Sequence, residues 1–170
     1  FFDFEEGTLQ GWLPTTTGGS GTTTVAAHNG SQMAFVQQTH PAYVGSTTAR
    51  LLSHDFTYVA TDLLSFDMQA VAVTGSAANA VAGVTVPFLN AFNVSLGSFS
   101  LFNTTAPGSL GPNQYPIDNQ QHHYGEGATM ATFAAQAGIN PALPISKISL
   151  SFVAYSNSFG SGLATGSVWF

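Results

Sequence analysis

The feature that most constrains the fold is a period-two alternation of apolar and polar residues that recurs along the chain. In the segment 63–73, one set of alternate positions is apolar, while Ser65, Asp67 and Gln69 occupy the other set. The segment 148–154 repeats the pattern. Successive side chains of a strand point to opposite faces of its sheet, so each segment predicts a strand with one buried face.

Turn signals separate these segments, and no part of the chain has a convincing helical period. Asn29-Gly30 lies between two strand-like segments and predicts a hairpin. The segment 129–135 fits a strand or one short helix, and its surroundings favour a strand. The sequence therefore predicts one domain, residues 1–170, folded as an all-β sandwich of jelly-roll type. The segment 103–127 is predicted to form one long irregular loop.

The N-terminal stretch shows the same alternation, with Phe2 and Phe4 separated by Asp3 and Glu5. It predicts a first strand that ends near Gly7. After that strand, Trp12 is expected to return to the core.

The chain carries very little charge. Only 6% of its residues are Asp, Glu, Lys or Arg, whereas a typical globular protein has roughly 25%. Arg50 and Lys147 are the only Lys or Arg residues, and the net charge is −6. Phosphate contacts dominate nucleic-acid binding, so the sequence excludes nucleic acid as a partner. Weak charge repulsion between copies favours self-association or a glycan coat.

The composition favours an exported protein. Lysine is rare, Thr, Ser, Asn and Gly are abundant, and cysteine is absent. The chain starts at Phe1, which we interpret as a processed start, and no apolar run reaches the ~18 residues that a membrane-spanning helix needs. We expect a secreted protein, located outside the cell or on the cell surface.

No catalytic motif emerges. The Gly-x-Ser-x-Gly elbow of hydrolases is absent. A glycosidase needs two carboxylates that face each other across a cleft. Away from the N-terminus, Asp67 and Asp118 are the most suggestive acids, and Asp67 is expected to face solvent. We predict that the protein is not an enzyme.

Four short segments follow one another along the chain in a recognisable order: Phe4-Glu5-Glu6-Gly7 with Gly11-Trp12, then 64–67, 148–152 and 166–170. Their order resembles that of galactose-binding-like jelly rolls, the β-sandwiches of many carbohydrate-binding modules. A similar outline occurs in exported bacterial proteins of the PEP-CTERM type.

The resemblance implies a structural calcium ion. Glu5 matches the first ligand position of the family, and Asp3 and Glu6 could each add one oxygen ligand. The family's second acid, an Asp after the last aromatic residues, has no counterpart in the sequence.

The long loop contains the residue types that bind glycans. Aromatic rings stack on sugar faces, and amides or acids bond to hydroxyls. The candidates in the loop are Tyr115, Asn119, Gln121, His122 and Tyr124. The alternative is that these aromatic residues pin the loop onto the sandwich.

Strand edges suggest another role. Edges are normally guarded by charged residues, above all Lys, and this chain has one Lys. The main functional prediction is a structural protein of a surface or matrix that self-assembles through strand edges, as a filament or sheath subunit. The alternative prediction is a glycan-binding module that uses the loop 103–127.

Overall fold

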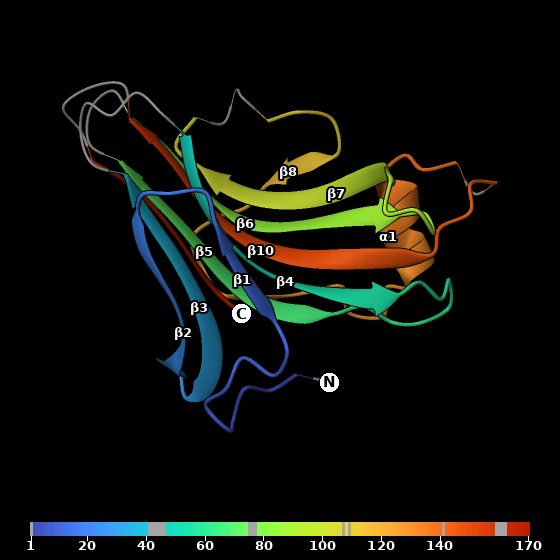
Figure 1. Ribbon diagram of the computed structural model, residues 1–170, viewed down its shortest axis with the longest axis horizontal. Helices are drawn as coiled ribbons and strands as arrows, with labels where there is room; N and C mark the ends of the chain where they lie inside the picture. Colours follow the sequence, from blue (N-terminus) through green and yellow to red (C-terminus); the bar gives the residue numbers. More distant parts are fainter. Residues whose placement is uncertain are drawn as a thin grey trace.

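The computed structural model describes residues 2–40, 47–74, 78–106, 108, 110–140, 142–158 and 163–170. They form two β-sheets and one helix (Figure 1). In spatial order, the six-stranded sheet contains β1 (Leu13–Thr16), β4 (Thr47–Thr57), β10 (Lys147–Ser158), β6 (Ala78–Leu89), β7 (Ser95–Thr104) and β8 (Gln114–Pro116). The five-stranded sheet contains β2 (Ser20–His28), β3 (Ser31–His40), β11 (Ala164–Trp169), β5 (Phe66–Thr74) and β9 (His122–Tyr124). This arrangement confirms the prediction of an all-β sandwich.

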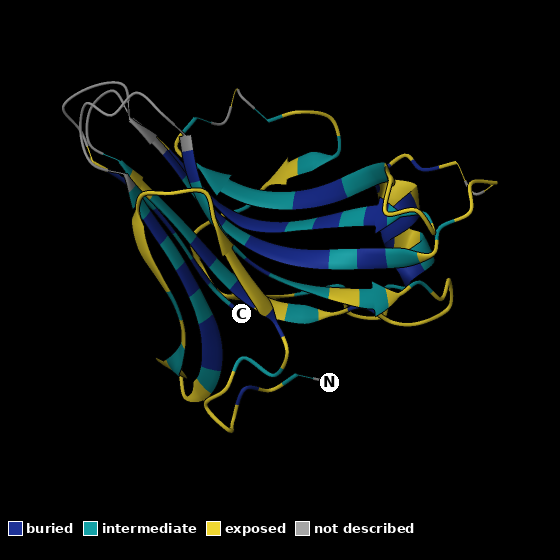
Figure 2. Cartoon of the chain, in the orientation of Figure 1, coloured by how far each residue is buried: buried dark blue, intermediate teal, exposed yellow. Residues whose placement is uncertain are grey.

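The core lies between the two sheets. On β10, Ile148, Leu150, Phe152 and Ala154 are all at most 4% exposed. Buried bands on the strands of both sheets mark the same layer in Figure 2. The alternation in 148–154 and 63–73 therefore identifies the inner faces correctly. Asp67 is exposed, as its position in the pattern predicts.

The predicted hairpin is present. Asn29 and Gly30 both have positive φ, 48° and 90°, as a two-residue turn of type I′ requires. Strands β2 and β3 pair antiparallel on either side of this turn.

The predicted first strand is wrong. Residues 2–4 are not part of a sheet, and Phe4 has a positive φ of 56°. A bond from the Gly7 amide to the Phe4 carbonyl closes a turn instead. Phe2 and Phe4 both pack their rings against other aromatic residues of the protein. Two packed residues that are two positions apart give the same sequence pattern as a strand, even when they lie in a turn.

The segment after residue 129 is a helix, α1 (Met130–Gln136), and not the strand that the surrounding sequence favours. Thr129 Oγ1 accepts a hydrogen bond from the Thr132 amide and caps the first turn. Met130, Phe133 and Ala134 are buried, which matches helical spacing.

The segment 103–127 includes both β8 and β9. It leaves β7, adds β8 to the six-stranded sheet and then reaches β9 at the edge of the five-stranded sheet (Figure 1). Residues 107 and 109 of this segment lie outside the described residues. No helix in the described ranges is long and apolar enough to cross a membrane.

Candidate functional site

A cleft of about 620 Å³ opens between the N-terminal segment and strands β5 and β9. Its floor is apolar and comes from the inner faces of both sheets. Phe152 of β10 and Phe170 form this floor, with ring centroids 3.5 Å apart and planes 10° from parallel. Phe66, the first residue of β5, packs edge-on against Phe152 with a centroid distance of 5.6 Å.

Aromatic contacts hold the N-terminal segment as one wall of the cleft. The Phe2 ring lies 5.7 Å from Trp12, 4.7 Å from His54 and 5.8 Å from Phe56, measured between centroids. Phe4 is 4% exposed and packs edge-on against Phe170 at 5.6 Å. These contacts fix the backbone that carries Asp3 and Glu5.

Both acids on this wall are positioned by hydrogen bonds. Asp3 Oδ1 accepts from the Glu5 amide at 3.3 Å and from Gln10 Nε2 at 3.1 Å. Glu5 Oε1 accepts from the Gln32 amide at 3.2 Å, which joins the wall to the start of β3.

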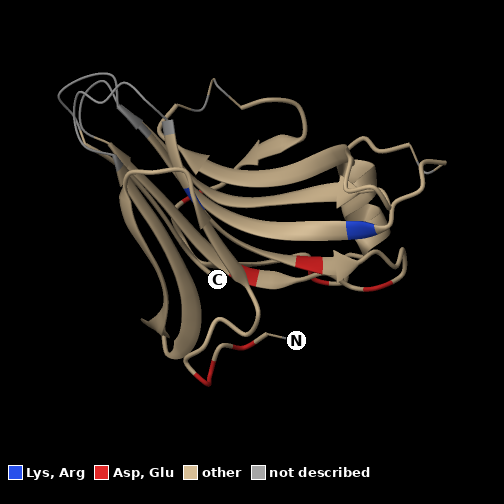
Figure 3. Ribbon diagram, viewed as in Figure 1, with Lys and Arg blue, Asp and Glu red and all other residues tan. Residues whose placement is uncertain are grey.

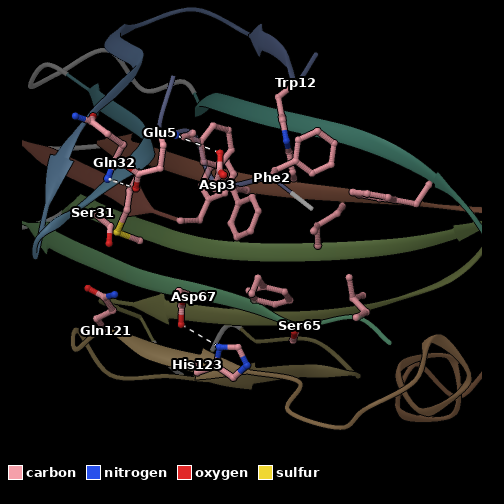
Figure 4. A pocket seen from close by; sticks show the side chains of 18 of the residues that line it. Phe2, Asp3, Glu5, Trp12, Ser31, Gln32, Ser65, Asp67, Gln121 and His123 are labelled. Atoms are coloured by element: carbon pink, nitrogen blue, oxygen red, sulfur yellow. Dashed lines mark hydrogen bonds and ion pairs between the residues drawn. The ribbon is translucent and has the colours of Figure 1, made fainter. Parts of the chain in front are cut away.

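Strands β5 and β9 form the opposite wall. Asp67 of β5 pairs with His123 of β9, with Oδ1 and Nδ1 3.0 Å apart. Gln121 lines the cleft just before β9. Figure 4 shows Asp3 and Glu5 on one side of the opening and Asp67, His123 and Gln121 on the other.

A polar bridge ties the segment before β9 to the β2–β3 turn. Asn29 Nδ2 donates to Gln121 Oε1 at 2.5 Å. Gln69 contacts His28 Nε2 at 2.6 Å, and its own Nε2 donates to the Asn119 carbonyl at 2.8 Å. The bridge fixes the position of Gln121 at the cleft.

The cleft is acidic. Asp3, Glu5 and Asp67 line it, whereas neither Lys nor Arg is among its described lining residues. Lys147 pairs with Asp55 at 2.5 Å and holds the pKa of that carboxyl below its ordinary value. Figure 3 shows how sparse charge is over the rest of the chain.

The structure places the loop residues predicted to bind glycans at several positions. Tyr115 lies on β8 in the six-stranded sheet, with its ring 5.5 Å from Phe99. Tyr124 lies on β9 in the other sheet, 5.8 Å from Phe66, and burial raises the pKa of its hydroxyl. Each tyrosine therefore packs against a ring of the sandwich.

Of the predicted loop residues, only Gln121 lines the cleft. Asn119 contributes its carbonyl to the polar bridge. His122 Nε2 lies 2.8 Å from Asp118 Oδ1. A bond from the Gln120 amide, together with His122, lowers the pKa of the Asp118 carboxyl.

Calcium binding at Asp3, Glu5 and Glu6 stays a prediction. Asp3 and Glu5 each accept protein donors with one oxygen, and Glu6 is exposed. The described residues contain no group of three or more His, Asp or Glu side chains that could hold a metal ion.

The sequence did not point to Phe2, Ser31 or His123 as residues of one site. They come from three segments that only the folded sheets bring together. The one usable signal is the run of acids near the N-terminus, which the sequence predicts to be possible metal ligands.

Comparisons with solved structures identify the fold. A structure from a study of promiscuous specificity in carbohydrate-binding modules of the β-sandwich superfamily matches with a TM-score of 0.57. The match has 14% identity and covers 99% of this chain and 60% of the other. The two structures share the β-sandwich fold. This chain thus spans about 60% of the length of that structure.

Other carbohydrate-binding modules are similar at lower scores. A family 28 module specific for non-crystalline cellulose has 17% identity, a TM-score of 0.46, and coverage of 98% of this chain and 87% of its own. A family 11 module from a cellulosomal cellulase of Clostridium thermocellum has 10% identity and a TM-score of 0.47, and the match covers 98% and 91% of the two chains. No protein-family model matches the sequence, and no curated protein matches it. The resemblance to PEP-CTERM-type proteins stays a prediction.

Proposed function

We propose that the protein is a non-catalytic glycan-binding module whose ligand occupies the cleft. The observation that carries this proposal is the lining of the cleft, in which polar side chains from opposite walls flank an apolar floor. Binding sites for small molecules have this composition, a mostly apolar surface with a few convergent polar groups. The fold shared with carbohydrate-binding modules supports the same class of ligand.

Each part of the cleft suits a different part of a sugar. Hydroxyl groups donate to the carboxylates of Asp3, Glu5 and Asp67, and Gln121 can donate and accept. Aromatic rings such as Phe2 and Phe66 offer apolar surface to the C–H faces.

The carboxylates are better suited to binding than to hydrolysis. A glycosidase keeps its general acid protonated by burying it beside apolar groups. Asp3, Glu5 and Asp67 are all exposed. We therefore propose binding without cleavage, outside the cell, where polysaccharides are found.

Binding to a panel of soluble polysaccharides, measured by affinity electrophoresis and calorimetry, tests this function. Asp67→Ala is expected to weaken binding at least about tenfold, since a hydrogen bond to a charged group contributes about 1.5–3 kcal/mol. The matched control is Asp62→Ala, because Asp62 is exposed and does not line the cleft.

Two results would contradict the assignment. No binding to any glycan would exclude the function. If Tyr115→Ala abolished binding and Asp67→Ala did not, the ligand would lie at the loop and not in the cleft.

Strand-edge assembly is a second candidate, and the β2 edge favours it. Strands β1, β8 and β9 also lie at sheet edges, but they have only four, three and three residues. β2 has nine residues and contains no Asp, Glu, Lys or Arg. A long edge without charge can accept a strand from a second copy.

Lysine on the β2 edge should prevent such association. Thr22 and Thr24 are exposed on β2, and the double variant Thr22→Lys, Thr24→Lys is expected to convert an assembling protein into a monomer. Size-exclusion chromatography and electron microscopy measure the change. Gln136→Lys, on the exposed side of α1, controls for added charge. A wild-type protein that stays monomeric at high concentration would exclude this candidate.

A further inference from the structure

We infer that the cleft prefers glycans with free amino groups, such as glucosamine oligosaccharides, over neutral or acidic glycans. This inference rests on the proposed function and specifies its ligand. It follows from the unpaired oxygens of the cleft carboxylates, the lack of basic residues at the cleft and an unpartnered donor in its wall.

Each cleft carboxylate has one oxygen that is engaged and one that is not. Asp3 Oδ1, Glu5 Oε1 and Asp67 Oδ1 are held by neighbouring groups of the protein. Their second oxygens accept no hydrogen bond from the described residues. The protein thus fixes the direction of each carboxylate and leaves an acceptor for a ligand.

Neither Lys nor Arg competes for these oxygens among the described residues that line the cleft. The chain has only two Lys or Arg residues, and neither Arg50 nor Lys147 lines the cleft. His123 is the one lining residue that can become cationic in the described ranges, and it already contacts Asp67. An ammonium group on the ligand would supply the missing positive charge.

Trp12 gives an independent indication of a ligand. Its side chain is 5% exposed and lines the cleft, yet its indole nitrogen has no hydrogen-bond partner. Buried indole N–H groups normally have an acceptor. Figure 4 shows Trp12 extending toward Phe2 at the cleft wall.

Charge then decides among glycans of similar shape. An ammonium group is attracted to the carboxylates of both walls, whereas an N-acetyl group at the same position is neutral. A uronate would be repelled, because its carboxylate and the carboxylates of the cleft are both negative and no Lys or Arg among the described lining residues lies between them. One partly exposed ion pair changes Kd by up to about fivefold.

Calorimetry with matched oligosaccharides tests the inference. Oligomers of glucosamine, of N-acetylglucosamine and of a uronic acid, all of one length, are compared at about pH 7, where amines are protonated and carboxylates ionised. We expect glucosamine oligomers to bind at least about fivefold tighter than N-acetylglucosamine oligomers, with the difference shrinking in high salt. Uronate oligomers should bind weakest.

Isosteric variants locate the preference. The double variant Glu5→Gln, Asp67→Asn removes two charges and keeps polar groups of the same shape, so it should bring the two Kd values within about twofold. Glu126→Gln, an exposed acid outside the cleft lining, should leave the preference unchanged. Trp12→Phe removes the N–H and should weaken both oligomers equally, with far-UV circular dichroism confirming the fold.

The outcomes separate this inference from the proposed function. Equal binding of glucosamine and N-acetylglucosamine oligomers would overturn the inference and leave glycan binding intact. A preference that survives in the double variant would overturn the role of these carboxylates. If no oligomer and no polysaccharide binds, both proposals fail.

Discussion

Replacing Phe152 with alanine should lower the free energy of unfolding by about 3–5 kcal/mol. Phe152 is 1% exposed in the middle of β10. Its ring stacks on Phe170 and packs against Phe66 and Trp12 at 5.6 and 5.7 Å. Removing it leaves a cavity that these three rings, which come from separate segments, cannot all move to fill. Urea denaturation measures the loss as a lower midpoint at constant slope.

Phe92→Ala is the matched control for this prediction. Phe92 is 86% exposed in the turn between β6 and β7, so its removal should change stability by no more than about 0.5 kcal/mol. Phe152→Leu keeps most of the buried volume and provides a folded variant for binding measurements. A loss of less than about 1 kcal/mol for Phe152→Ala would contradict the packing of the cleft floor.

The sequence predicts the sandwich well because alternate residues of a strand always face opposite sides of its sheet. The apolar–polar alternation in the sequence therefore becomes the buried–exposed alternation in the structure. In 148–154 every inward position is apolar, and the structure buries all of them. The same rule fails at Phe2 and Phe4, which reach the core from a turn. It also fails for α1, which has only seven residues and too few turns for its period to stand out. There, Thr129 as an N-cap was the better signal.

The cleft could not be predicted because it depends on how strands pair. Glu5, Gln32 and Asp67 are far apart in sequence. They line one cleft only because the strand order of the folded sheets brings their segments together. The sequence predicts a glycan-binding site in the loop 103–127 because the aromatic residues of that loop are close in sequence. Parallel pairing of β8 with β7 places Tyr115 in the six-stranded sheet, whereas Tyr124 lies in the other sheet. Closeness in the chain is therefore a poor guide to a site built between sheets.

Gly125→Ala should cost at least about 2 kcal/mol of stability and also disturb the cleft. Gly125 follows β9 with a φ of +77°, a conformation that strains any residue with a Cβ atom. A Cβ there would also overlap the Leu64 carbonyl oxygen, which belongs to the backbone and cannot turn aside as a side chain could. Because Leu64 lines the cleft, the clash should weaken glycan binding together with stability.

Gly127→Ala separates the two causes. Gly127 has a similar φ of +68°, but a Cβ there would meet no atom within 4 Å. Its alanine variant therefore carries the backbone strain alone, about 1 kcal/mol, and should leave binding unchanged. Thermal unfolding and calorimetry of both variants give the comparison. A larger loss for Gly125→Ala would show that the close approach of Gly125 to Leu64 sets the cleft wall, whereas equal losses would contradict it.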